Sequence, residues 1–401
     1  MKTAVIMFRH NESITDGEYV DKLASIFYAN GFGIDQFELL NIDDEIGFVK
    51  RIENLKDLVD NLVVIYNPLC SFDVRNIIAK SCDSVLDENE NAYKFFDAVC
   101  KRDGVDYPQE YAFVPVDAIL IPNITGAYQG FMIDDKEITL TLLPNGIKEI
   151  SVMVDKYLVP LLEAKFNLHR KRITLKYMGD INKLNQVLEK SKEISDCRFI
   201  NTVTEKHGDV KIDFLFEDYE SNNGGEIVRY IVSSLKDEIY AEYDVSLAER
   251  LFDILTLKNL KLSTAESFTS GNIASSIVKN SGASKIFFEG IVCYSNKSKI
   301  KRLGVKAEDL AREGAVSSIV AYQMALGLLQ EPQCDVAIAT TGIAGPKSDD
   351  TLKPVGLCFI AVGMRDGIHT YRFNLSGNRN SITEQAKNKA LFLTIKKLKN
   401  L

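Results

Sequence analysis

Short apolar runs alternate with helix-like segments along residues 1–168. Residues 3–7, 62–66, 118–121 and 138–143 form apolar runs of strand length, and residues 19–28 have helical spacing and end before Gly31. Such alternation is typical of parallel strands that are connected by helices. It predicts an α/β layer architecture for this part of the chain, with a closing helix over residues 156–165 that contains Pro160.

The rest of the chain divides into two further parts. A basic connection, His169-Arg170-Lys171-Arg172, leads into strand patterns at 173–177 and 209–216 and helical patterns at 180–190 and 225–239. We expect a small α+β module there. Helices at 246–257 and 381–398 then enclose strands at 260–264, 287–294, 336–339, 355–362 and 369–375. The sequence therefore predicts three domains, over residues 1–168, 169–243 and 244–401.

Composition limits the functions that this chain can have. The 401 residues are 46% hydrophobic and 26% charged, as in soluble globular proteins, and are sufficient for more than one core. The net charge of −8 argues against general binding to nucleic acid or to an anionic membrane. Seven scattered cysteines and four dispersed histidines predict reduced thiols and no zinc site. With no apolar run of membrane-spanning length and no signal peptide, the cytoplasm is the expected location.

One stretch, Lys-Leu-Ser-Thr-Ala-Glu-Ser-Phe-Thr-Ser-Gly at residues 261–271, combines a strand pattern with a turn rich in hydroxyl groups. A helical run over residues 272–279 follows, so Ser267, Thr269 and Ser270 lie where a helix begins. The free N–H groups of a helix start bind anions. The same residues are also favoured as ordinary N-caps. Both interpretations are open for this stretch taken alone.

Three further loops at strand ends carry groups that contact phosphate or carbonyl oxygen. They are Tyr294-Ser295-Asn296-Lys297-Ser298-Lys299, Thr340-Thr341-Gly342-Ile343-Ala344-Gly345-Pro346 and Lys353-Pro354-Val355-Gly356. Ligands of open α/β sheets gather at loops beyond the carboxyl ends of the strands. We therefore expect these loops and residues 266–271 to line one pocket, which offers hydroxyls and a lysine but no metal motif.

In order and spacing, these four segments and Gly314-Ala315-Val316-Ser317 resemble the C-terminal domain of CinA proteins, the nicotinamide-nucleotide amidase family. The resemblance implies hydrolysis of the carboxamide of nicotinamide mononucleotide to nicotinate mononucleotide and ammonia, without a cofactor or metal. Amide hydrolysis needs a nucleophile, a proton shuttle and donors for an oxyanion. We predict Ser267 as the nucleophile and Lys299 as the base, with Thr269 as an alternative nucleophile or a substrate-positioning hydroxyl.

The base requires a lysine whose pKa is lowered by desolvation or by nearby positive charge, and Lys297 is a candidate for that charge. A phosphate-binding or plain surface lysine is the alternative for Lys299. Backbone N–H groups near Thr341 and Gly342 would form either an oxyanion hole or a phosphate cradle. The predicted substrate-binding residues are Glu266, Ser270, Gly271, Tyr294, Ser295, Asn296, Thr341, Gly342 and Arg379. For Glu266 we expect a ligand-orienting or structural carboxylate rather than an acid catalyst.

The C-terminal part departs from the family pattern at several positions. The family's Glu-Ser-Cys-Thr-Gly-Gly has become Glu-Ser-Phe-Thr-Ser-Gly, which places Phe268 and Ser270 in the turn. Lys347-Ser348-Asp349-Asp350 replaces a usual glycine pair, and Thr383 stands where a second arginine is common. These changes predict an altered turn and weaker phosphate binding.

The N-terminal segments Phe113-Val114-Pro115 and Asn123-Ile124-Thr125-Gly126-Ala127-Tyr128-Gln129-Gly130-Phe131 resemble the N-terminal domain of CinA proteins, which is similar to molybdopterin-binding enzymes. The resemblance implies a three-layer fold. Three loops have lost most of the family's glycines, which let a backbone approach phosphate. They are Arg9-His10-Asn11-Glu12, Tyr66-Asn67-Pro68-Leu69-Cys70-Ser71-Phe72-Asp73-Val74 and Leu143-Pro144-Asn145-Gly146-Ile147. We expect the ADP-ribose pyrophosphatase activity to be lost, and a residual activity would require a divalent metal.

By the same resemblance, the middle module is KH-like and the chain forms a homodimer. Asn222-Asn223-Gly224-Gly225 lacks the Gly-x-x-Gly spacing with which KH modules clamp nucleic acid, so we expect a spacer or a dimerisation element. The chain as a whole is then either an amidase for a small mononucleotide or a non-catalytic nucleotide-binding or scaffold protein.

Overall fold

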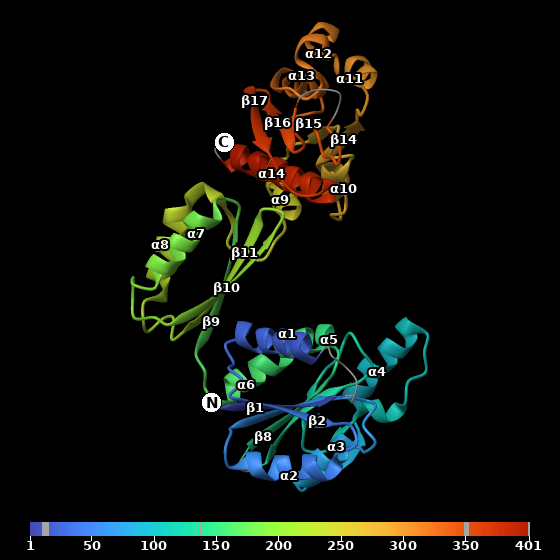
Figure 1. Ribbon diagram of the computed structural model, residues 1–401, viewed down its shortest axis with the longest axis vertical. Coiled ribbons are helices and arrows are strands. Elements are labelled where there is room, and N and C mark those ends of the chain that lie inside the picture. Colours follow the sequence, from blue (N-terminus) through green and yellow to red (C-terminus); the bar gives the residue numbers. More distant parts are fainter. Residues whose placement is uncertain (10–15, 136–137, 349–352, 400–401) are drawn as a thin grey trace. The chain divides into compact units, whose positions relative to one another are not determined.

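The computed structural model describes residues 1–9, 16–135, 138–348 and 353–399 (Figure 1). The chain forms two compact units. The first contains Met1–Lys171 with Cys197–Asn201 and Leu215–Tyr219, and the second contains Arg172–Asp196, Thr202–Phe214 and Glu220–Leu401. The boundaries of the three predicted domains stay a prediction.

A six-stranded sheet with the order β2-β1-β3-β8-β7-β6 forms the centre of the first unit. Its first four strands are parallel, and β7 and β6 are antiparallel to their neighbours. The bounds are β1 Thr3–Arg9, β2 Gln36–Asn41, β3 Asn61–Tyr66, β6 Ile119–Ile121, β7 Gly130–Asp135 and β8 Ile138–Pro144. A separate antiparallel pair consists of β4 Leu86–Glu88 and β5 Phe113–Pro115.

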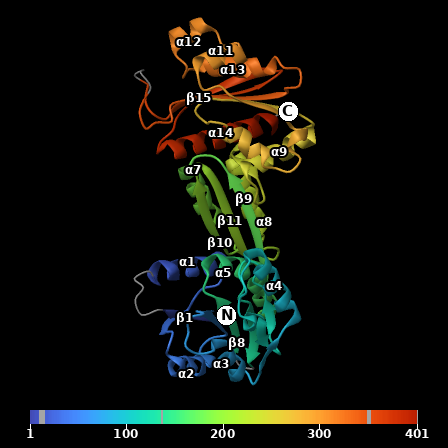
Figure 2. The same ribbon diagram turned by 90° about the vertical axis from the view of Figure 1, so that its right-hand side faces the viewer.

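Helices cover both faces of this sheet. Their bounds are α1 Asp16–Ala29, α2 Glu45–Lys56, α3 Val74–Ser81, α4 Glu90–Asp103, α5 Ile147–Met153 and α6 Val159–Lys165, with a 3-10 turn at Gln109–Ala112. Figures 1 and 2 show α1, α5 and α6 on one face and α2 and α3 on the other. Each face has its own core, because alternate residues of β1 such as Val5 and Ile6 are buried on opposite sides. The expected three-layer α/β architecture is confirmed.

Pro160 lies at a change of helix type. A π-helical turn over Val154–Leu158 separates α5 from α6, and Pro160 falls in the first turn of α6. Proline is tolerated in a first turn because its missing N–H is not needed there. The predicted closing helix is thus made of two successive segments.

A four-stranded sheet with the order β10-β11-β9-β12 follows in the chain. Its elements are β9 Arg170–Tyr177, β10 Phe199–Lys206, β11 Asp209–Glu217, β12 Ile239–Ala241, α7 Ile181–Ser191, α8 Gly224–Leu235 and a 3-10 turn at Lys236–Glu238. The α+β class is confirmed, but the prediction of two strands was wrong. β10 was not predicted because its polar sequence has no buried face. β12 was not predicted because it has only three residues.

A five-stranded sheet, β14-β13-β15-β16-β17, carries the last part of the chain. Its strands are β13 Leu262–Glu266, β14 Phe287–Val292, β15 Val336–Gly342, β16 Leu357–Met364 and β17 Gly367–Asn374. The helices are α9 Leu247–Lys258, α10 Asn272–Val278, α11 Asn296–Leu303, α12 Ala307–Glu313, α13 Ser318–Leu329 and α14 Arg379–Lys399, with a 3-10 turn at Ala283–Lys285. One core joins α9, α10 and α14 to the sheet, and another joins α11–α13 to its opposite face (Figures 1 and 2).

Among the described residues, no helix combines the length and the apolar character that crossing a membrane requires.

Candidate active site

The topology of the last sheet brings the predicted loops to one edge. β13 pairs in parallel with β14 on one side and with β15 on the other, so the three strands end at the same edge. β16 runs antiparallel to β15 and therefore begins there, with Gly342 opposite Cys358. The chain leaves β13 toward β14 and later returns to its other side as β15. This reversal of strand order is where open α/β sheets bind ligands.

Ser267 and Lys299 meet at this edge. Ser267 directly follows β13, and Lys299 lies in the first half of α11, which begins three residues before it. The Nζ atom of Lys299 donates to the Oγ atom of Ser267 over 3.1 Å. The lysine is only 1% exposed and the serine 8%. A surface lysine is therefore excluded, and the hydroxyl and the amine form a buried pair.

Two backbone carbonyls hold the amine of Lys299 from the other side. Its Nζ atom donates to the carbonyl oxygens of Cys293 at 2.8 Å and Tyr294 at 3.3 Å. A neutral amine has two N–H groups and one lone pair. If the N–H groups point to the carbonyls, the lone pair faces the Ser267 hydroxyl. In that arrangement the Ser267 hydroxyl would donate to the amine, the reverse of the direction in the structure, where the amine donates.

Burial lowers the pKa of the Lys299 amine below its usual value, because the charged form loses hydration. Lys297 is exposed, and residues two apart on a helix do not face each other. Lys297 therefore has no part in lowering the pKa of Lys299, and that part of the sequence interpretation was wrong.

Glu266 occupies the start of α10. Its carboxylate, 1% exposed, accepts hydrogen bonds from the N–H groups of Gly271 at 3.0 Å, Ile273 at 3.2 Å and Ala274 at 2.8 Å. An internal anion thus fills the position at which the sequence predicted phosphate binding, and no serine or threonine side chain caps this helix. The turn at residues 267–271 is therefore neither a free anion site nor an ordinary serine or threonine N-cap, and both interpretations were wrong. Glu266 itself is too buried to contact a substrate directly.

Thr269 is separated from the site by its own hydrogen bond. Its hydroxyl shares a hydrogen bond of 2.7 Å with the hydroxyl of Thr340, and both side chains are fully buried. The bond joins the turn after β13 to the end of β15. Thr269 therefore holds the turn in place, and its hydroxyl lacks both the exposure and the neighbouring base that a nucleophile needs.

Two backbone donors beside Ser267 escaped the sequence analysis. In the part of the chain that the structure describes, the N–H groups of Phe268 and Thr269 have no hydrogen-bond acceptor. The N–H group of Ser267 itself donates to the carbonyl of Thr340. In acyl-transfer enzymes, the N–H of the residue after the nucleophile often stabilises the oxyanion. Residue spacing alone does not show which amides stay free, so no sequence signal pointed to this pair.

Phe268 belongs to the core. It is buried against Ala344, Cys358, Leu375 and Ile382. Its ring also explains Gly342, because a Cβ atom there would lie 3.0 Å from the Phe268 ring and 2.6 Å from the Cβ of Cys358. The aromatic replacement in the turn is therefore accommodated in this apolar cluster.

Gly342→Ala is expected to lower the free energy of unfolding by about 1–3 kcal/mol, because the added methyl overpacks this core. Chemical denaturation measures the change. Gly33→Ala is the matched control, since no atom lies within 4 Å of the added Cβ. Equal effects of the two substitutions would contradict the packing role of Gly342.

Ser270 has a left-handed backbone, with φ of 58°, and Gly271 follows with φ of 91°. The left-handed region is unfavourable for residues that have a Cβ atom. We expect Ser270→Gly to raise the free energy of unfolding by about 1 kcal/mol, as measured by chemical denaturation. Ser275→Gly, at an exposed position within α10, should instead lower it by about 0.5 kcal/mol. Destabilisation by Ser270→Gly would rule out strain at this position.

Three other predicted residues have structural contacts. Ser295 accepts a hydrogen bond from the Ser298 N–H and caps α11, and Thr341 donates to the carbonyl of Ala315 at 2.7 Å. Arg379 begins α14 and donates to the carbonyl of Gly345 at 2.7 Å. Tyr294 and Asn296 have exposed side chains. Of the predicted substrate contacts, five have exposed side chains, namely Ser270, Tyr294, Ser295, Asn296 and Arg379.

Comparisons with known proteins match the part of the chain that contains this site. The family model described as the CinA C-terminal domain matches residues 244–398. A CinA-like protein of Kosmotoga olearia is 36% identical over 283 residues, which cover 69% of this chain and 68% of that protein. A putative competence-damage inducible protein of Caldicellulosiruptor saccharolyticus is 32% identical over 338 residues, or 80% and 78% of the two chains. The chain belongs to the CinA family. The resemblance predicted from the sequence is confirmed.

Among solved structures, a CinA superfamily protein of Klebsiella pneumoniae shares 32% identity and a TM-score of 0.38 with this chain. The match covers 39% of this chain and 97% of that one.

The N-terminal loops of this CinA-family chain are filled by its own side chains. Tyr66, at the end of β3, stacks on Tyr128 with 4.4 Å between ring centroids, and the guanidinium of Arg75 lies 5.5 Å from the Tyr128 ring. A Cβ atom at Gly126 or Gly146 would collide with the carboxylate of Glu149. Residues 10–12 of the first replaced loop, and Asp349 and Asp350, lie outside the described residues. Within the described ranges, no three His, Cys, Asp or Glu side chains are grouped to hold a metal ion.

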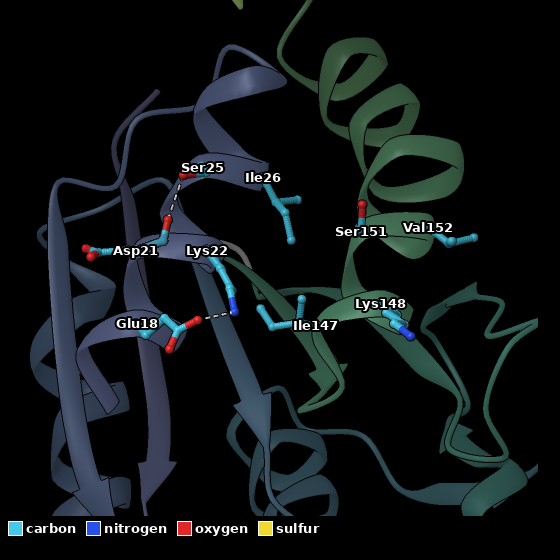
Figure 3. A pocket seen from close by; sticks show the side chains of 9 residues that line it. All are labelled: Glu18, Asp21, Lys22, Ser25, Ile26, Ile147, Lys148, Ser151 and Val152. Carbon is cyan, nitrogen blue, oxygen red and sulfur yellow. Dashed lines mark hydrogen bonds and ion pairs between the residues drawn. The ribbon is translucent and has the colours of Figure 1, made fainter. Parts of the chain in front are cut away.

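A hollow of about 550 Å³ lies between α1 and α5 in the first unit (Figure 3). Serines and lysines line it, but they do not pair with one another. Ser25 donates to the carbonyl of Asp21 at 2.7 Å, and Lys22 forms an ion pair with Glu18 at 2.5 Å. The side chains drawn in Figure 3 thus contain no hydroxyl next to a base, unlike the Ser267–Lys299 pair.

Proposed function

We propose that this CinA-family chain is an amidase that hydrolyses the carboxamide of nicotinamide mononucleotide to nicotinate mononucleotide and ammonia. The observation that carries the proposal is the buried contact between the Lys299 amine and the Ser267 hydroxyl, with two carbonyls clamping the amine. The nucleotide substrate comes from the family resemblance of the loops. The amide chemistry is supported by the residues themselves.

In the proposed acylation, Ser267 Oγ attacks the carboxamide carbon while its proton passes to the Lys299 amine. The carbonyl oxygen becomes an oxyanion, for which the free N–H groups of Phe268 and Thr269 are the available donors. When the C–N bond breaks, the Lys299 ammonium protonates the leaving nitrogen, which departs as ammonia. The nicotinoyl group remains as an ester on Ser267.

In the proposed deacylation, Lys299 is neutral again and takes a proton from water, which attacks the ester. The tetrahedral intermediate forms at the same donors, and its collapse returns the proton to Ser267 Oγ. The product is nicotinate mononucleotide. Neither step needs a metal or a cofactor, because the lysine performs both proton transfers.

For the rest of the nucleotide we propose contacts with exposed groups around the edge. Arg379 offers the guanidinium N–H groups that its bond to Gly345 leaves free, and guanidinium suits phosphate. Tyr294 and Asn296 lie beside the lysine clamp and suit the ribose. The start of α10 is excluded as the phosphate site, because Glu266 fills it.

The test is ammonia release from nicotinamide mononucleotide by the purified 401-residue chain. We expect turnover that is unchanged by a chelator. Circular dichroism checks that the chain is folded, and absence of ammonia from folded protein would contradict the proposal. Tight binding of the nucleotide without turnover would indicate a binding or scaffold protein, and chelator-sensitive cleavage of ADP-ribose would indicate residual activity in the N-terminal part.

A further inference from the structure

We propose that Glu266 is a positioning residue of this site, which fixes the turn after Ser267 so that the Phe268 and Thr269 amides stay free for the oxyanion. The inference rests on the proposed amidase function. Glu266 directly precedes the nucleophile, and its carboxylate contacts neither Ser267 nor Lys299 through a hydrogen bond within the described chain. The hydrogen bonds of Glu266 therefore connect it to the site through the backbone of the turn.

Both carboxylate oxygens are fully engaged. Oε2 accepts from the N–H groups of Gly271 and Ile273, and Oε1 accepts from that of Ala274. The side chain is 1% exposed, so no water competes for these donors. Glu266 thus joins the end of β13 to the start of α10 across the catalytic turn.

The turn is closed at three further points. The Ser267 N–H donates to the Thr340 carbonyl, the Ser270 N–H donates to the Ser267 carbonyl, and the Thr269 hydroxyl bonds to that of Thr340. Together with the Glu266 bond to Gly271, these contacts use the N–H groups of residues 267, 270 and 271. The amides that stay free are those of Phe268 and Thr269.

One residue of the turn has an unfavourable backbone conformation, which other contacts must stabilise. Ser270 has a φ of 58°, which costs energy for a residue with a Cβ atom. This left-handed step, continued by Gly271, reverses the chain so that the start of α10 returns to the carboxylate of Glu266. The three bonds to the carboxylate offset that cost and keep the turn in one conformation.

An uncharged isostere cannot make the same contacts. Glutamine keeps one acceptor oxygen, but its NH₂ group would face a backbone N–H group, since all three partners of Glu266 are donors. Glu266→Gln should therefore loosen the turn while leaving the side-chain volume, Ser267 and Lys299 in place.

Steady-state kinetics on the full chain test the inference with a matched control. Glu249→Gln also removes a carboxylate from a helix start, since Glu249 accepts from the N–H of Ser246 at 2.9 Å in the capping box of α9. We expect both substitutions to lower Tm. Only Glu266→Gln should lower kcat, by about 100-fold, with KM nearly unchanged, because oxyanion donors act in the transition state.

A second measurement does not depend on the amide substrate. A fluorophosphonate reacts with an activated serine, as Oγ displaces fluoride and the tetrahedral phosphonyl oxygen occupies the position of the oxyanion. Mass spectrometry follows labelling at Ser267. Glu266→Gln should slow labelling severalfold relative to the wild type, and Glu249→Gln should not. If Glu266→Gln proves too unstable to assay, the double variant with Ser270→Gly is compared with Ser270→Gly alone, and the same losses are expected.

Wild-type kcat and labelling in folded Glu266→Gln, or equal losses in Glu249→Gln, would overturn the inference and leave Glu266 as a stabilising cap. A wild-type chain that labels at Ser267 but releases no ammonia would refute the proposed substrate instead. Slower labelling of Glu266→Gln would in that case still support the positioning role.

Discussion

Lys299→Met is expected to lower kcat for nicotinamide mononucleotide hydrolysis by about 10²- to 10⁴-fold, the range in which a general base contributes. The substitution keeps an apolar side chain of similar length but removes the amine that contacts Ser267. It also leaves the carbonyls of Cys293 and Tyr294 without this donor. Steady-state kinetics and thermal unfolding together separate the loss of the base from a loss of stability.

Lys297→Met is the matched control, because Lys297 lies on the same helix with an exposed side chain. Its kcat should stay within about twofold of the wild type, as is usual for surface substitutions. A folded Lys299→Met variant with wild-type kcat would show that Lys299 is structural. Equal losses in both variants would point to the helix rather than to the amine.

The pH dependence of the wild type follows from the burial of Lys299. Only the neutral amine accepts the Ser267 proton, so kcat should rise with pH and level off above the pKa of Lys299 in the folded chain. That pKa lies below the usual value of about 10.5. Between the two values the unfolded chain binds a proton that the folded chain has released. Relative to Lys299→Met, the free energy of unfolding should therefore increase with pH across this interval.

Ser267→Ala is expected to lower kcat by about 10⁴-fold or more, because the acyl-enzyme loses its only attachment atom. Thr269→Val separates the two candidate nucleophiles. It removes a hydroxyl that bonds to Thr340 in the core, so it should lower the free energy of unfolding by about 1–3 kcal/mol and still permit turnover. Kinetics, denaturation and mass spectrometry of the trapped nicotinoyl-enzyme measure these effects.

The position of the acyl group decides between the hydroxyls. We expect the added mass on the peptide that contains Ser267 and its absence in Ser267→Ala. An acylated Thr269, or an active Ser267→Ala variant, would reassign the nucleophile. The buried Thr269–Thr340 hydrogen bond makes that outcome the less favoured one.

The sequence was sufficient to predict the α/β layers, because a buried parallel strand such as β3 is a nearly continuous apolar run. It also indicated the Ser267–Lys299 pair, since both residues follow strands that were visible in the pattern. Helices α11 and α12 were missed because their sequences are strongly polar. They are also only eight and seven residues long, which is too short to establish a helical period.

A structural carboxylate at Glu266 was among the expectations, but its hydrogen-bond partners at the start of α10 could not be predicted from the sequence. A carboxylate that caps a helix from before a five-residue turn differs from the usual N-cap pattern, in which the capping residue directly precedes the helix. The hydrogen bond between Thr269 and Thr340 joins residues 71 positions apart. Such contacts depend on the register of neighbouring strands, and hydroxyl spacing along one chain does not encode that register.

Ser267, Lys299 and the two carbonyls that clamp the amine all lie within residues 262–303. One contiguous strand–helix–strand–helix segment holds the groups that we propose to break the amide bond. Arg379 and Thr383 lie on helix α14, which is distant from this segment in the sequence. Mutations that accumulate there can change which amides a descendant accepts without removing its ability to cleave them. As related sequences diverge, we therefore expect the range of amide substrates to broaden or shift before amide hydrolysis itself is lost.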